Sequence, residues 1–251
     1  MSFSKVSKVS TNDRAIHCVT GTPNCSAFYN WALTKLQDIL SRWHLAYTGP
    51  MTTGLQGNLG EFLSYHVARQ SGLSGPGFTG IALGANSPLN IGAPTGLDAT
   101  IVFLSPDGDT SKDRLYVMEM KTTIVQNLSY ANALVGDCEK LLDATRPSTN
   151  LANRMSGLKG FLSDTLEFSD ALLDRVEDLY RPTAAECVKV KLIPTLVHDL
   201  RYGDPVVTLD GVARKIELLG WLPTSVEPWS VSLTRLDECL QHLRHQAAFV
   251  P

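Results

Sequence analysis

The chain has 251 residues and a formal net charge of −3 at pH 7, with a sequence pI near 6.1. This balance excludes a protein that coats nucleic acid through bulk positive charge, because such binding depends on many lysines and arginines. No apolar run approaches the ~20 residues that cross a bilayer, and the first residues do not indicate a signal peptide. Hydrophobic residues make up 43% of the chain, which is typical of one large globular domain.

The first part of the chain is predicted to form a strand and two helices. A strand is expected at residues 15–19, and residues 26–45 carry apolar side chains on one helical face. Residues 59–70 again show helical spacing, and Glu61 lies off the apolar stripe of that helix. The residues between 72 and 96 are rich in glycine, serine and proline, so we expect a loop there.

Two strands joined by a turn are predicted next. Residues 97–104 form a short β-rich run, and the turn residues Ser-Pro-Asp-Gly-Asp follow it. The second strand covers residues 114–123, where Glu119 and Lys121 share one face because side chains alternate with a period of two. A hairpin of these strands would bring Asp98 beside Glu119 and Lys121.

The rest of the chain mixes helices and strands. Helices are predicted at residues 128–142, within 149–180 and at 234–245, and strands at 188–197 and 216–222. Residues 199–211 carry turn residues, and 223–228 indicate a loop. His198 and His242 are isolated and are interpreted as surface residues. We expect a single domain over residues 1–251, made of an N-terminal extension with one helix (1–56), a motif-bearing core (57–142), a helical insertion (143–187) and terminal strands and a helix (188–251).

The hairpin residues have the chemistry of a divalent-metal site. Mg²⁺ or Mn²⁺ prefers carboxylate oxygen ligands, and Asp98 with Glu119 would supply two of them. A bound cation of this kind activates a water and neutralises charge on a phosphodiester during hydrolysis. Lys121 would position the attacking water, and Glu61 would assist as a further metal ligand from its helix.

Each of these residues also has a structural interpretation. Asp98 is also typical of a turn cap at the start of a strand. Glu119 and Lys121 are also typical of a solvated ladder of charges on an edge strand. Glu61, in the first turn of its helix, would be favoured there by the helix macrodipole alone.

The combination of Gly60-Glu61, Asp98 and Glu119-X-Lys121 resembles the PD-(D/E)XK nuclease superfamily between residues 57 and about 140. The resemblance implies an α/β restriction-endonuclease-like core, a mixed sheet flanked by helices, here with helical insertions. It also implies a metal-dependent nuclease with Asp98, Glu119, Lys121 and Glu61 in the catalytic site. Two departures are visible. Leu97 stands where the family name has proline, and the acid that follows the lysine has no clear counterpart, with Gln126, Asn127 and Glu139 as candidates.

Within this superfamily the chain is similar to nuclease subunits of bacterial anti-phage defence systems of the Hachiman type. That resemblance implies a DNA substrate and a helicase or ATPase as a protein partner, and it leaves the oligomeric state open. Arg146, Arg154, Lys159 and Arg181 fall in the insertion and are candidates for one edge of a substrate cleft, although each is also typical of a solvated helix.

Five scattered cysteines, among which Cys138, Cys187 and Cys239 lie in apolar patterns, favour buried thiols and a cytoplasmic location. A second functional class stays open beside the enzyme. A catalytically silent PD-(D/E)XK-like module that only binds DNA or a protein partner would have the same core. The carboxylate pair and Lys121 favour the active nuclease over that alternative.

Overall fold

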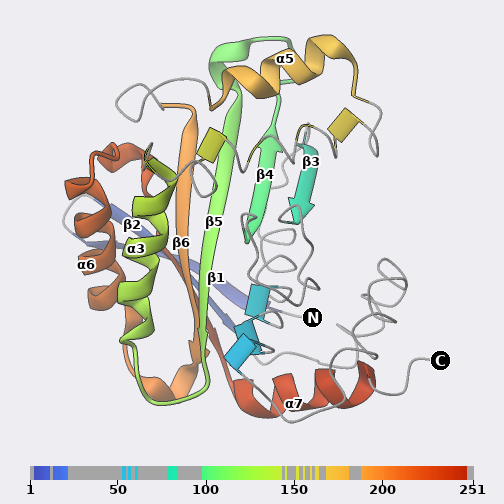
Figure 1. The fold of residues 1–251 in the computed structure, drawn as a ribbon. Helices are drawn as coiled ribbons and strands as arrows, with labels where there is room; N and C mark the ends of the chain where they lie inside the picture. Colours follow the sequence, from blue (N-terminus) through green and yellow to red (C-terminus); the bar gives the residue numbers. More distant parts are fainter. Residues whose placement is uncertain are drawn as a thin grey trace.

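The chain folds around one mixed β-sheet with helices on its faces, which confirms the predicted α/β class (Figure 1). The computed structural model describes residues 3–11, 14–21, 53–54, 56–57, 60–61, 78–83, 98–142, 145, 151–152, 155, 159, 162–163, 168–180 and 188–247. Within these described residues, seven strands form the sheet in the order β1-β2-β7-β6-β5-β4-β3. Their bounds are β1 Phe3–Thr11, β2 Arg14–Gly21, β3 Phe78–Leu83, β4 Ala99–Phe103, β5 Arg114–Thr123, β6 Val190–Asp199 and β7 Trp229–Leu233.

The sheet has an antiparallel part and a parallel part that meet at β5. Strands β3, β4 and β5 form an antiparallel meander, whereas β6 pairs in parallel with both β5 and β7. Strand β7 also pairs in parallel with β2, and the β1–β2 hairpin closes that side of the sheet. Parallel neighbours need crossover connections, and in this chain α3 lies between β5 and β6, and α6 between β6 and β7.

The described helices are α3 Tyr130–Leu142, α5 Asp170–Asp178, α6 Pro205–Leu218 and α7 Leu236–Ala247. Helices α3 and α6 pack side by side, α3 over β5 and β6 and α6 over β6, β7 and β2, while α5 crosses the end of the sheet near the β4–β5 turn (Figure 1). Leu134, Cys138 and Leu141 of α3 are buried together with Leu115 and Val117 of β5. This packing fixes the position of α3 over one face of β5. No helix among the described residues is long and apolar enough to span a membrane.

Several predicted elements are confirmed with nearly the same bounds. Strand β5 matches the predicted residues 114–123, and β4, α3, β6 and α7 lie within a few residues of their predictions. Strand β2 contains the predicted strand at 15–19, so residues 1–56 contribute to the sheet itself. Within the predicted helix at 59–70, residues 60–61 are helical, and helical residues also occur within 149–180. The predicted helix at 26–45 lies outside the described residues, as do Arg146, Arg154, Arg181 and Cys187.

Three predictions about secondary structure were wrong. Residues 78–83, expected to be loop, form β3 at the edge of the sheet because β4 offers them an antiparallel partner. Residues 216–222 were expected to be a strand and 199–211 a turn, but residues 205–218 form α6. The Asp204 side chain accepts a hydrogen bond from the Val206 N–H at 2.8 Å, and Pro205 occupies the first turn. An aspartate followed by proline is a helix start, and that signal outweighs the β-branched residues that follow.

The surface interpretation of His198 was also wrong, because this residue is fully buried in β6. Its Nε2 atom lies 3.1 Å from Ser230 Oγ and 2.7 Å from Ser232 Oγ on β7, and Nδ1 lies 2.9 Å from the Asp199 carbonyl oxygen. Burial lowers the pKa of His198, so the neutral ring is favoured in this polar row. The side chain of His242 lies outside the described residues.

Beside His198, Asp199 connects the end of β6 to α7. Its buried carboxylate accepts hydrogen bonds from the backbone N–H groups of Arg201 and Leu236, each at 3.0 Å, and from the Arg201 guanidinium. The Arg201 side chain, with these backbone donors, holds the pKa of Asp199 at about 2.

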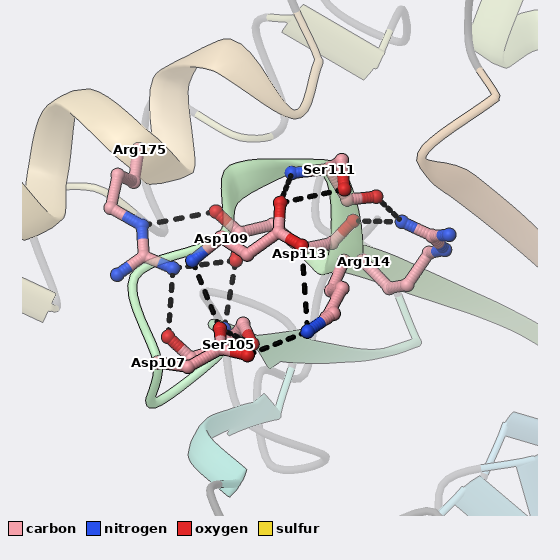
Figure 2. Close-up of polar contacts among 8 residues, drawn as sticks. Ser105, Asp107, Asp109, Ser111, Asp113, Arg114 and Arg175 are labelled. Atoms are coloured by element: carbon pink, nitrogen blue, oxygen red, sulfur yellow. Dashed lines mark hydrogen bonds and ion pairs between the residues drawn. The ribbon is translucent and has the colours of Figure 1, made fainter.

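The β4–β5 turn is fastened to α5 by a buried ion pair (Figure 2). Asp113, only 1% exposed, accepts a hydrogen bond from the Ser105 N–H at 2.8 Å. Arg175 donates to both carboxylate oxygens of Asp113, at 2.6 and 3.0 Å, and also to the Ser105 carbonyl oxygen. The turn itself is ordered by Asp107, which accepts from Ser105 Oγ and from Lys112 Nζ. These contacts set the register of the hairpin at the end far from Glu119.

We predict that Arg175→Ala destabilises the fold much more than loss of an exposed arginine. Removing the guanidinium leaves the Asp113 carboxylate buried without its main partner, which costs about 3 kcal/mol of unfolding free energy. Arg214→Ala is the matched control, because Arg214 forms an exposed pair with Asp210 within α6. Its loss is expected to cost less than about 0.5 kcal/mol. Urea unfolding of the two variants measures the difference, and equal losses would contradict this account of the turn.

Candidate active site

The candidate site forms where β5 loses its β4 neighbour. Ala99 pairs with Met118, and the same register continued by one step places Asp98 opposite Glu119. Beyond that step, the Met120 N–H donates to Asp98 Oδ2 at 2.6 Å, so a carboxylate replaces the next backbone acceptor of the ladder. Gln56 Nε2 donates to the Thr122 carbonyl oxygen at 2.6 Å on the same strand. Asp98 therefore has a structural role at the start of β4. This agrees with the interpretation of Asp98 as a capping residue there, without excluding a role in the site.

Glu119 is buried on β5. It is 3% exposed, although β4 pairs with β5 only as far as Met118 and β6 alone continues to Thr123. The interpretation of Glu119 as part of a solvated ladder of charges is therefore wrong. Burial raises the pKa of the Cys138 thiol far above its usual value, and the charges of Glu119 and Asp137 raise it further. Cys138 belongs to α3, so that helix lies over the face of β5 that carries Glu119.

Glu61 is brought to the same place by a close approach of two backbone segments. A Cβ atom on Gly60 would lie 1.7 Å from Thr122 Oγ1 and 2.7 Å from Thr122 Cβ. Only glycine allows the helical residues 60–61 to lie this close to β5. Burial raises the pKa of Glu61 to about 8, and the charges of Asp98 and Glu119 contribute to the rise, against the effect of Lys121. The four residues predicted from the sequence, Asp98, Glu119, Lys121 and Glu61, thus form one electrostatic group.

Lys121 is held by an acid that the sequence analysis did not identify. Its Nζ atom lies 2.6 Å from Asp137 Oδ2, and Lys140 Nζ lies 2.8 Å from the other oxygen, Asp137 Oδ1. Burial acts to lower the pKa of Lys121, but Asp137 and the charges of Asp98 and Glu119 raise it above its ordinary value. Lys121 is therefore a permanent cation at neutral pH.

The candidates named for the acid after the lysine do not occupy this position. Gln126, Asn127 and Glu139 are exposed. Asp137 instead falls on the buried side of α3, three residues after Leu134 and four before Leu141. The sequence signal that could have identified Asp137 was its place on the apolar stripe of a predicted helix, because a charged residue is rarely buried there without a partner.

The three carboxyl groups of Asp98, Glu119 and Glu61 have the chemistry that a hard divalent cation prefers. Their arrangement, however, is not that of a complete metal-binding site. Three carboxylates repel one another in a partly buried place, as the raised pKa of Glu61 indicates, and a cation with oxygen ligands would relieve that repulsion. Among the described residues, however, no group of three or more His, Cys, Asp or Glu side chains is arranged to hold a metal ion. Asp98, Glu119 and Glu61 thus have the chemistry of metal ligands, and they are close enough to interact electrostatically, but they are not assembled into a metal site.

The basic residues expected at a cleft edge are only partly described. Lys159 Nζ lies 2.7 Å from Glu177 Oε2 of α5, so its charge is engaged within the insertion. Lys140, beside Asp137, is a described cation closer to the site.

Comparison with known proteins adds no relative from which a role for these residues could be transferred. Neither a scan against protein-family models nor a search of curated proteins found a match to this chain.

We predict that Gly60→Ala is destabilising, whereas Gly136→Ala is not. The Cβ added at position 60 would overlap the Thr122 side chain, and such overpacking costs about 2 kcal/mol. A Cβ at Gly136 in α3 meets no atom within 4 Å, so alanine there should stabilise by about 0.5 kcal/mol through its helix propensity. Thermal unfolding of both variants provides the comparison. A harmless Gly60→Ala would mean that residues 60–61 do not lie against β5 as described.

We predict a pH-dependent difference in stability between the parent chain and Glu61→Gln when divalent cations are absent. The pKa of Glu61 is about 8 when folded and near its ordinary value of 4.5 when unfolded. Its contribution to stability is fully present below pH 4.5 and is lost as the pH rises through about 8, because the unfolded chain then releases the proton first. Glu61→Gln has no such proton to lose. Its stability relative to the parent should therefore rise between about pH 5 and 8 in urea titrations, and parallel profiles would contradict the raised pKa.

Proposed function

We propose that this chain is a metal-dependent nuclease with a restriction-endonuclease-like core, acting on phosphodiester bonds in DNA. The observation that carries the proposal is the proximity of Asp98, Glu119 and Glu61 to one another and to the cation of Lys121 at the end of β5. A structural role alone does not account for a buried Glu61 whose pKa is raised to about 8 by burial and by the charges of Asp98 and Glu119. Strained electrostatics of this kind are typical of functional sites.

The proposed roles follow from the position of each side chain. Asp98, Glu119 and Glu61 would hold Mg²⁺ or Mn²⁺, which when bound supplies charge neutralisation at the phosphate and an activated water. Lys121, kept protonated beside Asp137, would orient the attacking water and offset negative charge on the phosphate oxygens. Glu61 is protonated at neutral pH when no cation is near, so cation binding is expected to release its proton.

The alternative, a catalytically silent module that binds DNA or a protein partner, is supported by one observation. Asp98 Oδ2 accepts a hydrogen bond from the Met120 backbone, which engages one of its two oxygens in the fold. A purely structural Asp98 would leave Glu119 and Glu61 as the only carboxylates of the predicted set for a metal. Metal binding therefore separates the two functions.

The proposed biological setting is that of an effector subunit in an anti-phage defence complex, with a helicase or ATPase partner. It rests on the resemblance of Gly60-Glu61, Asp98 and Glu119-X-Lys121 to such nuclease subunits. A net charge of −3 supports dependence on a partner, since it gives little long-range attraction for a polyanion. Tryptophan is favoured at protein–protein interfaces, and Trp31 and Trp43 would be candidates for a docking face, but both lie outside the described residues.

We predict that the purified chain cleaves plasmid DNA with Mg²⁺ or Mn²⁺, alone or with the product of the neighbouring gene. Glu119→Gln and Lys121→Met should each lower the cleavage rate by about 100-fold or more, because each removes a charge that acts in the transition state. Glutamine is preferred to alanine at position 119 because Glu119 is buried and truncation there would open a cavity. Glu238→Gln on α7, an exposed acid paired with Arg235, is the matched control and should cleave at the parental rate.

Calorimetric titration with Mn²⁺ tests the metal site without relying on activity. The parent should bind the ion, Asp98→Asn should bind it more weakly, and Glu238→Gln should bind it as the parent does. Binding of DNA without metal binding or cleavage would favour the silent module. Cleavage of single-stranded RNA in preference to plasmid would keep the nuclease but correct its substrate.

A further inference from the structure

A row of alternating charges leads from the buried carboxylates toward the surface. Glu119 is 3% exposed, and the side chains of Lys121, Asp137 and Lys140 are 29%, 17% and 40% exposed. Asp137 stands between the two lysines, with one carboxylate oxygen 2.6 Å from Lys121 Nζ and the other 2.8 Å from Lys140 Nζ. Burial opposes ionisation of Asp137, but the two lysines lower its pKa below the ordinary value. The acid is therefore charged when it contacts Lys121.

The backbone that carries Asp137 is fixed more firmly than the side chain it contacts. Helix α3 is anchored by Ala131, Leu134, Cys138 and Leu141, all of which are buried. Asp137 immediately precedes Cys138 and needs only a short side chain to reach Lys121. A lysine has four flexible bonds and loses considerable rotamer freedom when it is held in one place. The helix thus supplies a rigid point to which a flexible cation is tied.

We propose that Asp137 is the positioning residue of the site, which holds the Lys121 ammonium beside Asp98 and Glu119 for the reaction. This inference rests on the proposed nuclease function. Lys140 shares the charge of Asp137 from the opposite side, so the carboxylate can hold Lys121 without adding a full negative charge to a place where a phosphate must enter. Loss of Asp137 would leave Lys121 charged but mobile. Small misplacements of a catalytic group can lower a rate by about 100-fold.

The kinetic experiment compares Asp137→Asn, Asp137→Glu and a matched control in the full chain. Asp137→Asn keeps the size of the side chain and should lower kcat for plasmid cleavage by about 10-fold or more, with KM changed less than about twofold. Asp137→Glu restores the charge and should recover part of the rate. Asp210→Asn is the control, because Asp210 is also 17% exposed and also ion-paired, to Arg214 on α6. Parental kcat in Asp137→Asn, or no recovery in Asp137→Glu, would overturn the proposal.

A second experiment measures the contact between Asp137 and Lys121 directly and does not depend on cleavage activity. In a chain labelled with ¹⁵N-lysine, the Lys121 ammonium resonance can be assigned by its loss in Lys121→Arg. It should be protected from solvent exchange in the parent and in Asp210→Asn, and should broaden or shift in Asp137→Asn. An unchanged resonance in Asp137→Asn would overturn the proposal even if the chain is a nuclease. Failure of the parent chain to cleave any nucleic acid, both alone and with the product of the neighbouring gene, would overturn the proposed function and the catalytic part of this inference, whereas the resonance would still decide whether Asp137 holds Lys121.

Discussion

The crowding of three acids at the end of β5 is the constraint that the surrounding structure must satisfy. Burial and the charges of Asp98 and Glu119 raise the pKa of Glu61 to about 8, so Glu61 is held as a neutral acid beside two carboxylates. The arrangement persists because each acid is fixed from a different direction. Asp98 is held by the Met120 N–H, Glu61 by the close approach of Gly60 to Thr122, and Glu119 by the interior of the sheet. Lys121 supplies the compensating charge.

The same crowding also explains why the positive charge is organised in two layers. A single lysine beside the charged Asp98 and Glu119 leaves a net negative site, which would repel a phosphodiester. Lys140 adds a second cation further out, and Asp137 between the lysines lets both remain charged at short range. The favourable charge interactions that offset the crowding of the acids thus come partly from Asp137 and Lys140 of α3. The position of this helix depends in turn on apolar packing against β5.

The central hairpin could be predicted from the sequence because its signals are local. A turn of Pro-Asp-Gly-Asp between two β-rich runs determines the register, and the register determines that Asp98 lies opposite Glu119. The helical stripe of α3 is likewise contained in its own residues. Local patterns therefore predicted which residues meet at the candidate site. The position of Glu61 depends on the contact of Gly60 with Thr122, which joins segments distant in the chain, and the sequence alone offered only the resemblance for it.

Elements whose form depends on distant partners were harder to predict. Strand β3 is a strand because β4 pairs with it, and the β-forming residues Phe78, Thr79 and Ile81 are outweighed in the sequence by the glycines within and around them. His198 looked like a lone surface histidine because its partners, Ser230 and Ser232, lie on β7, far along the chain. Asp137 was missed because no sequence spacing relates a helical acid to a lysine on the preceding strand. In each case the decisive contact is tertiary.

The pairing of β2 with β7 has a consequence for how the chain tolerates shortening. His17 of β2 lies beside Trp229 of β7. A strand near the start of the chain therefore pairs with the edge of a strand near its end. Without the β1–β2 hairpin, β7 would become an outer strand whose residues are all buried in the intact protein. An uncovered apolar strand of this kind offers its backbone to a second molecule. The β1–β2 hairpin therefore acts as a cover against self-association, a role independent of any chemistry at β5.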